Sequence, residues 1–530
     1  MDIKSINTHV GVTAQIGVAD IPAIAALGYK SIICNRPDGE EEGQPASAEI
    51  GAQAQRNGLG FAYAPAVSGA ITDENVDAMA RALAELPAPV LAYCRSGARS
   101  TKLFEMASAR GAQSGARTPQ GVRTHDVVIV GGGSAGIATA ASLLSRNPKL
   151  DIAIVEPSEV QYYQPGWTMV GAGVFKPETT RRAEAQVMPQ GVTWIRAAAT
   201  GFAPDDNRVI LNDGGEIAYR VLVACPGIKL DWDAIPGLPD TLGKNGVTSN
   251  YGYDLAPYTN RLVAEFKGGR ALFTQPPMPI KCAGAPQKAM YLACHRWEKA
   301  GVLKKSEVEF HTAGAVLFGV AAYVPALMEY ITRYGAQLKL ESKLTAIDGK
   351  AKVATFEHKQ GDQTMRTEER FDMIHVVPPQ TAPDFVRSSP LAAPSGFIAV
   401  DEATLRHPRY RNVFALGDAC AASNAKTAAA ARKQAPVVAV NVLAALAGKE
   451  PQADYDGYGS CPLTVEAGKI VLAEFGYGGK LLPSFPLWLI DGTRPSRLSW
   501  LLKDTILPPF YWHGMLKGRE WMVKPHMIGG

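Results

Sequence analysis

A glycine-rich turn lies between an apolar strand-like run and an apolar helix-like run. The sequence HDVVIV leads directly into GGGSAG, residues 131–136, and then into IATAASLL. In such a turn Gly131 permits the tight bend, Gly133 lets the backbone approach a pyrophosphate, and Gly136 allows close packing of helix on strand. The next apolar run ends in Glu156, whose carboxylate is suited to ribose hydroxyls. These residues predict a dinucleotide-binding site.

A second strand, far along the chain, indicates which dinucleotide is bound. The run RNVFALGDA ends in Gly417 and Asp418, and an apolar helix is expected over residues 426–446. This stretch resembles the second FAD motif of flavoproteins with two dinucleotide-binding domains, in which the Asp holds the flavin end of the cofactor. Lys426 either stabilises the reduced flavin ring or is simply a solvated lysine. Together the two motifs predict FAD.

A protein that uses a nicotinamide would carry another glycine turn in the middle of the chain. The strand expected over residues 270–274 is followed instead by QPPMPIKC, with three prolines where glycines would be needed. NAD(P)H is therefore not the expected reductant. A disulfide reductase of the glutathione reductase type is disfavoured too, because residues 156–200 contain no cysteine.

Two of the seven cysteines stand where a thiol could react. Cys282 follows Lys281 at an expected strand-to-helix transition, where a helix N-terminus and a lysine both lower a thiol pKa. Cys420 comes two residues after Asp418. Each is equally consistent with a buried small apolar residue, the usual fate of a free cysteine. The sequence has no CxxC pair and no His/Cys cluster, so no metal site is expected.

Longer runs around these cysteines resemble the sulfide:quinone oxidoreductases of mitochondria and many bacteria. They are KCAGAPQKAMYL, QYYQPGWTMVGAG, GDAC…AKTAAA and YDGYGSCPL, within a resemblance that spans about residues 125–525. The resemblance implies two cysteines bridged by a disulfide or trisulfide on one side of FAD, with a ubiquinone-type quinone on the other. Hydrogen sulfide would open the bridge and leave a persulfide for glutathione or another thiol acceptor.

The same resemblance assigns roles to individual cysteines. Cys282 would be the thiolate that adds to the flavin ring, and Cys420 would carry the sulfane sulfur. Ala419 separates Cys420 from the Gly-Asp pair, whereas the family places its cysteine directly after that pair. The other cysteines of this region, Cys225, Cys294 and Cys461, are interpreted as structural. Two alternatives are a type II NADH:quinone dehydrogenase with a phosphatase domain, and a redox or sulfide sensor that does not turn over.

The first 110 residues end in a cysteine loop, YCRSGARS, between an expected strand and an expected helix. Successive backbone N–H groups and Arg99 would form an anion cradle that lowers the pKa of Cys94. The domain resembles the phosphatase-like family of β-lactamase-hydrolase-like proteins, with residues 35–41 in place of the acid loop. Arg99 follows Cys94 by five residues, one fewer than in tyrosine phosphatases, and this shorter ring is similar to that of rhodanese. Sulfur transfer is favoured over phosphate hydrolysis, and a vestigial domain is the third possibility. Asp38 is either an acid or a solvated turn residue.

The order of apolar runs predicts an α/β protein. A phosphatase-like or rhodanese-like domain over residues 1–110 and a linker over 111–124 precede two interleaved Rossmann-like domains over 125–480. The expected buried strands of these domains are residues 127–130, 152–155, 221–224, 270–274, 374–377 and 413–416. The net charge of the 530-residue chain, +4, is too small to indicate a nucleic-acid partner.

The final segment, residues 481–530, differs from the rest. Residues 496–519 mix Trp, Leu and Phe with Lys and Arg, as in a segment at a membrane surface beside a quinone entrance, although a core or dimer-contact helix would look similar. No window reaches eighteen consecutive apolar residues, and the first residues lack the pattern of a secretory signal. The expectation is a cytoplasmic protein attached peripherally to the inner face of the membrane, with an oligomer possible.

Overall fold

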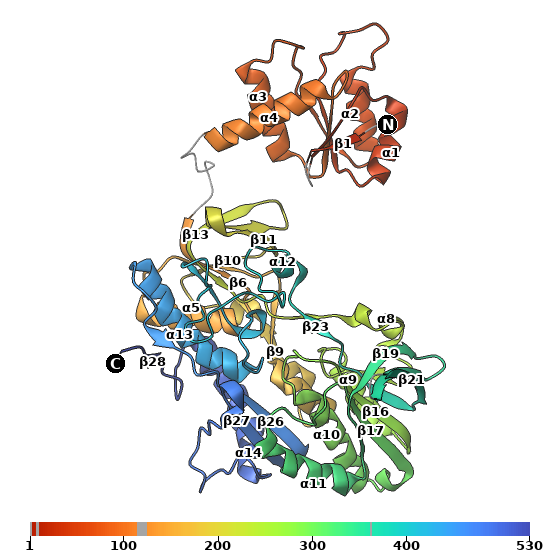
Figure 1. Ribbon diagram of the computed structural model, residues 1–530, viewed down its shortest axis with the longest axis vertical. Helices are drawn as coiled ribbons and strands as arrows, with labels where there is room; N and C mark the ends of the chain where they lie inside the picture. The colour runs from red at the N-terminus through yellow and green to blue at the C-terminus, as the bar shows by residue number, and fades with distance from the viewer. Residues whose placement is uncertain (1–2, 7–9, 114–123, 361–362, 530) are drawn as a thin grey trace. The chain divides into compact units, whose positions relative to one another are not determined.

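The computed structural model describes residues 3–6, 10–113, 124–360 and 363–529, and it divides into two compact units between Val122 and Arg123 (Figure 1). The first unit ends with helix α4, which runs to Gln113, three residues into the segment expected as a linker. Residues 114–123 of that expected linker lie outside the described residues.

The N-terminal unit is a five-stranded sheet with helices on both faces. Its strands are β1 (Ile3–Ser5), β2 (Val10–Thr13), β3 (Ser31–Cys34), β4 (Gly60–Tyr63) and β5 (Val90–Tyr93), in the order β1-β2-β5-β3-β4. All neighbours pair in parallel except β1 with β2. Its helices are α1 (Ile21–Ala26), α2 (Ser47–Arg56), α3 (Asp73–Glu85) and α4 (Ala98–Gln113). Consecutive residues Ile32 and Ile33 enter separate cores on opposite faces, as strand geometry requires.

A seven-stranded sheet forms the first Rossmann-like domain of the larger unit. Its order is β10-β7-β6-β13-β12-β11, with β24 paired to β13. The strands are β6 (Thr124–Val130), β7 (Ile152–Val155), β10 (Val192–Ile195), β11 (Ala199–Ala203), β12 (Arg208–Leu211), β13 (Glu216–Ala224) and β24 (Val413–Ala415). Helices α5 (Ser134–Arg146) and α13 (Ala428–Leu446) pack on each other and on this sheet. The expected strands over residues 127–130, 152–155, 221–224 and 413–416 are confirmed, and all of them pair in parallel.

A second sheet of five parallel strands forms the other nucleotide-type domain. Its strands, in spatial order, are β15 (Val247–Thr248), β22 (Met373–His375), β16 (Gly269–Gln275), β17 (Ser306–Thr312) and β18 (Gln337–Lys339). An antiparallel sheet of β19 (Ser342–Asp348), β20 (Val353–Gln360) and β21 (Gln363–Arg370) adjoins it. The α/β fold of two Rossmann-like domains is therefore confirmed.

The C-terminal part of the chain contacts both Rossmann-like domains. The hairpin of β26 (Gly459–Glu466) and β27 (Lys469–Phe475) packs against helix α10 (Ala285–Lys299). It is followed by α14 (Arg497–Leu501), a π-helical turn over Leu502–Ile506, and α15 (Leu507–His513). Among the described residues, no helix has the length and apolar character needed to cross a membrane.

Candidate active site

The glycine turn adopts the geometry that a dinucleotide site needs. Gly131 has a φ of +105°, and a Cβ there or at Gly136 would collide with the backbone of Cys225 or of Gly131 itself. A Cβ at Gly133, in contrast, would meet nothing within 4 Å, so open space lies at the start of α5, where free N–H groups favour a phosphate.

Two carboxyl groups line this turn. Glu156 accepts hydrogen bonds from the backbone N–H groups of Gly132 and Ser158, each at 2.8 Å, which fixes its direction. Glu184 is buried, and burial together with the charge of Glu156 raises its pKa to about 8. Its Oε1 has no hydrogen-bond partner in the described part of the chain. An unpartnered buried oxygen of this kind fits a site that a polar ligand completes.

The second motif lies beside the cysteine turn. Gly417 has a φ of +71° and donates its N–H to Gln434 at 2.8 Å. Burial raises the pKa of Asp418, against the lowering effect of the nearby Lys426 and Lys281 charges. Lys426 is buried, its Nζ donates to the Cys420 carbonyl at 2.8 Å, and it is therefore not the solvated lysine considered as an alternative.

Several further buried polar atoms in this unit lack partners among the described residues. They are Gln161 Nε2, Trp167 Nε1, Thr168 Oγ1 and Gln380 Nε2. Gln380 and Trp167 both lie against Lys281, through a 2.8 Å hydrogen bond and a 5.9 Å ring contact. The open glycine turn and these unpartnered groups fit a bound molecule with many polar atoms, as FAD is.

Cys282 lies beside Cys461, and not beside the predicted partner Cys420. The Cys282 and Cys461 sulfurs are 3.6 Å apart, because the Cys282 turn at the start of α10 packs against β26. Cys420 is fully buried and directs its thiol to the Gly417 carbonyl at 3.3 Å. The structure therefore places Cys461, which was expected to be structural, beside Cys282 in the position predicted for Cys420.

Charges around the pair make the two thiols unequal. A hydrogen bond from Cys461 lowers the pKa of Cys282 well below its ordinary value; burial opposes this shift, and Lys288, whose Nζ is 3.1 Å from the sulfur, adds to it. The pKa of Cys461 is raised well above its ordinary value by its hydrogen bond to Cys282 and by burial. Lys288 Nζ lies nearer to the Cys282 sulfur, at 3.1 Å, than to the Cys461 sulfur, at 3.9 Å, so Cys282 is the better placed of the two to carry negative charge.

A second buried lysine reaches the pair from the C-terminal segment. Lys503 is 4% exposed and donates to the Thr464 hydroxyl at 3.1 Å. Burial, with repulsion from Lys288, lowers its pKa to about 7, while both cysteines raise it. Lys281, the cation expected to activate Cys282, instead directs its Nζ to Gln164 at 2.6 Å. The sequence signal for Lys288 was its position in the first turn of α10, since helical side chains point back toward the N-terminus.

The Cys282 backbone is held in an unusual conformation. Its φ of +50° is one that residues other than glycine adopt at a cost of roughly 1–3 kcal/mol, and such residues concentrate at functional sites. The Cys282 N–H donates to the Lys426 carbonyl at 2.8 Å, and the Tyr251 hydroxyl donates to the Lys281 carbonyl at 3.0 Å. These contacts hold the thiolate toward Cys461 and join the cysteine turn to the second flavin motif.

In the N-terminal unit, Cys94 lies between β5 and α4, fully buried. Burial alone would raise its pKa, but hydrogen bonds from Ser100, Ser96 and Arg99 outweigh burial and lower it. The Arg99 guanidinium donates to the Ala66 carbonyl and to Glu40, each at 2.7 Å. Its Nε is buried and has no partner among the described residues.

Asp38, the candidate acid of the N-terminal unit, is held away from such a role. Its two carboxylate oxygens accept from the backbone N–H and the hydroxyl of Ser47, each at 2.7 Å. Ser47 is the first residue of α2, so Asp38 satisfies donors at the start of that helix. Asp38 is thus neither a free acid nor a merely solvated turn residue.

A doubly wound dinucleotide domain, a second nucleotide-type domain and a pair of neighbouring cysteines define a two-domain flavoprotein oxidoreductase. The family model described as pyridine nucleotide-disulphide oxidoreductase matches residues 125–263. The mitochondrial sulfide:quinone oxidoreductases of Dictyostelium discoideum and Mus musculus are 42% and 37% identical to this chain, over 75% and 74% of its length and 87% of each relative. The chain belongs to the sulfide:quinone oxidoreductase family, and it is an FAD-dependent oxidoreductase.

Two further comparisons concern the fold and the N-terminal unit. The crystal structure of the Aquifex aeolicus sulfide:quinone oxidoreductase superposes with a TM-score of 0.63 at 19% identity, over 76% of this chain and 97% of that one. The model described as the phosphatase-like domain of β-lactamase hydrolase-like protein matches residues 2–111. The β-lactamase hydrolase-like protein of Agrobacterium fabrum is 36% identical over 109 residues, which are 21% of this chain and 25% of that protein.

Proposed function

We propose that this protein oxidises sulfide to sulfane sulfur on the Cys282–Cys461 pair and delivers the electrons to a membrane quinone. The single observation that carries the proposal is the pair itself, two sulfurs 3.6 Å apart with Lys288 against them, in a chain of this family. The chemistry needs an electrophilic sulfur, a stabilised leaving thiolate and an electron acceptor.

The unequal pKa values of Cys282 and Cys461 determine which of the two cysteines is the leaving group. When the two sulfurs are bridged, hydrosulfide attacks one of them, and the cysteine with the lower pKa is the better leaving group. Cys282 therefore departs as the thiolate, held by Lys288, and Cys461 keeps the incoming sulfur as a persulfide. A thiol such as glutathione then takes up that sulfur, leaving the reduced pair. FAD, when bound, would supply the two-electron acceptor that the reduced pair needs to re-form its bridge and the link to the quinone.

Anaerobic titration with sulfide tests this proposal. Sulfide is expected to bleach the visible absorbance of the FAD-loaded protein within the time of one catalytic turnover, and a soluble ubiquinone analogue should restore that absorbance. NADH should leave the absorbance unchanged, because β16 is followed by Pro276 and Pro277 and no glycine turn is available there to bind a second dinucleotide. Bleaching by NADH alone would favour the dehydrogenase alternative, and bleaching by sulfide without quinone turnover would favour a sensor.

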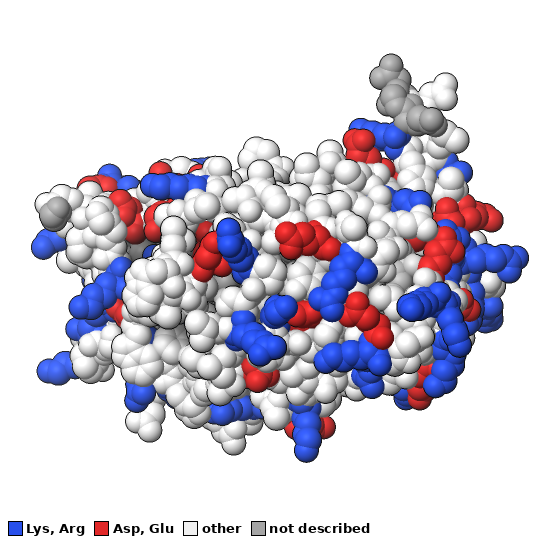
Figure 2. Space-filling model, turned by 90° about the horizontal axis from the view of Figure 1, so that it is seen from below, with Lys and Arg blue, Asp and Glu red and all other residues white. Residues whose placement is uncertain are grey.

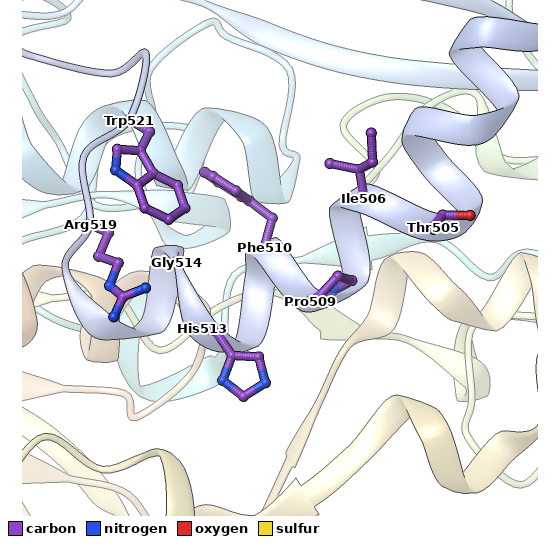
Figure 3. A pocket seen from close by; sticks show the side chains of 8 residues that line it. All are labelled: Thr505, Ile506, Pro509, Phe510, His513, Gly514, Arg519 and Trp521. Atoms are coloured by element: carbon purple, nitrogen blue, oxygen red, sulfur yellow. The ribbon is translucent and has the colours of Figure 1, made fainter.

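Attachment to the membrane surface is supported by the outer side of the C-terminal segment. Leu498, Leu501, Ile506 and Trp521 are each about half exposed there. A shallow pocket of about 370 Å³ on this segment is lined by both apolar and basic side chains, among them Phe510 and Arg519 (Figure 3). Figure 2 shows one face of the molecule, on which Lys and Arg side chains lie among Asp and Glu side chains and between uncharged areas. Apolar residues beside basic ones favour an anionic lipid surface.

Replacing Leu498 and Leu501 by serine is expected to weaken binding to vesicles that contain anionic lipid by roughly ten-fold or more, because two half-exposed leucines no longer enter the interface. Vesicle flotation measures the effect. The matched control is Met365→Ser, at a position that is 46% exposed on β21, away from this segment. Equal flotation of the double variant and of the control would reject attachment through α14.

For the N-terminal unit we propose sulfur transfer through Cys94. The thiolate would attack the outer sulfur of a persulfide or of thiosulfate, forming a Cys94 persulfide and releasing a thiol or sulfite. The lowered pKa of Cys94 supports a nucleophilic thiolate, and the unpartnered Nε of Arg99 supports an anionic ligand. The contacts of Asp38 with Ser47 count against phosphate ester hydrolysis, since they engage both oxygens of the carboxyl that was expected to protonate the leaving alcohol.

Cys94→Ser in the full chain is expected to lower thiosulfate:cyanide sulfur transfer by at least about 100-fold, because the nucleophile is lost. Cys34→Ser, a buried cysteine of the same unit, is the control and should keep the activity. A parallel assay with p-nitrophenyl phosphate decides between the two chemistries. Phosphate release by the wild-type chain that depends on Cys94, without measurable sulfur transfer, would reverse the assignment.

A further inference from the structure

We propose that residues 507–521 of the C-terminal segment support the flavin site, with Tyr511 and Glu520 as positioning residues for α5. Helix α5 begins at the glycine turn, and its free N–H groups would hold the pyrophosphate of bound FAD. The inference rests on FAD binding, which follows from family membership, and does not depend on which substrate reduces the flavin.

Tyr511 fixes the beginning of α5. Its hydroxyl is 2.7 Å from the hydroxyl of Ser134, the first residue of the helix, although the two residues are 377 positions apart. The Tyr511 side chain is buried, its ring centroid is 4.9 Å from that of Tyr163, and its hydroxyl also donates to the Tyr162 carbonyl at 3.4 Å. A residue from the C-terminal part of the chain is therefore hydrogen-bonded to the side chain of the first residue of α5.

Glu520 holds the other end of the same helix. Its carboxylate accepts from the Arg146 guanidinium at 2.8 Å and from the Ser142 hydroxyl at 2.6 Å. Burial would raise the pKa of Glu520, but these two partners outweigh burial and lower it. The carboxylate is therefore ionised and bonded at neutral pH, as a charge-assisted contact requires.

Between the Tyr511 and Glu520 contacts, the segment packs closely on α5. Gly518 has a φ of +67°, and a Cβ there would lie 2.8 Å from the backbone of Ala141 in the middle of α5. The segment thus contacts α5 at its first residue, its middle and its last turn. Phe510 and Arg519, which line the pocket in Figure 3, belong to these same residues 507–521. Deleting the C-terminal segment would consequently disturb the flavin site together with any membrane contact.

Conservative variants of the full chain test this role. Tyr511→Phe and Glu520→Gln should each raise the dissociation constant for FAD by about five-fold, and the double variant by more, since each change removes a partly buried hydrogen bond to α5. FAD retained after gel filtration, and the recovery of flavin fluorescence on dilution, measure this without any sulfide assay. Tyr334→Phe is the matched control, because its buried hydroxyl donates to the Val465 carbonyl at 3.0 Å, away from α5.

The change in melting temperature on adding FAD separates loss of the cofactor contact from poor folding. In the proposed arrangement the Tyr511 and Glu520 variants gain less stability from FAD than wild type, whereas the control gains as much. FAD dissociation constants within two-fold of wild type for both variants would overturn the proposal. So would an equal loss of FAD in the Tyr334→Phe control. Normal FAD binding to the wild type with no reaction with sulfide would contradict the proposed substrate and leave this inference standing.

Discussion

Cys461→Ser is expected to lower sulfide:quinone turnover on the order of 10³-fold or more, because the bridge to Cys282 can no longer form. The serine hydroxyl is close in size to the thiol, so FAD content should stay near that of wild type. The measurement is the steady-state rate with sulfide and a soluble quinone, together with the extent of flavin bleaching under anaerobic conditions.

The matched control for this prediction is Cys420→Ser, which tests the alternative pairing directly. The Cys420 thiol contacts the Gly417 carbonyl at 3.3 Å, and a serine hydroxyl can donate to the same oxygen. We expect this variant to keep most of the activity. Loss of activity in Cys420→Ser with full activity in Cys461→Ser would restore Cys420 as the redox partner and reject the geometry described above.

Lys288→Gln is expected to move the acid limb of the activity profile to higher pH by about one to two units, the range that an adjacent opposite charge produces. In the wild type the pKa of Cys282 is depressed, so the thiolate is present above that low pKa and lost only as the pH falls through it. Removing the Lys288 charge raises the pKa of Cys282, and a larger fraction becomes protonated at neutral pH. The rate of alkylation of the reduced protein by iodoacetamide, measured against pH, reports this ionisation.

Two controls make the Lys288 result specific. Lys299→Gln removes an exposed charge at the far end of the same helix and should leave the alkylation profile in place. Lys288→Arg keeps the charge and should recover most of the wild-type profile. An unchanged profile in Lys288→Gln would show that another group ionises Cys282. The Lys503 charge offers a partial substitute below about pH 7, since its pKa lies near that value.

The dinucleotide and cysteine-loop motifs could be predicted because they are contiguous in sequence. A turn that needs a positive φ at Gly131 requires glycine at that residue, and the strand before it and the helix after it carry their own apolar periodicity. The same holds for the Gly417-Asp418 pair and for the ring between Cys94 and Arg99. The parallel α/β fold followed from short buried runs that alternate with helices.

The partner of Cys282 was decided only by the tertiary structure. Cys420 lies closer in sequence and next to a flavin motif, yet its side chain turns back to Gly417. Cys461, which is 179 residues away from Cys282, is brought to 3.6 Å because β26 packs on α10. Lys503 and Tyr511 reach the site by the same kind of long-range packing. Local sequence governs backbone conformation, whereas contacts between distant segments depend on the summed packing of whole elements, which no single motif encodes.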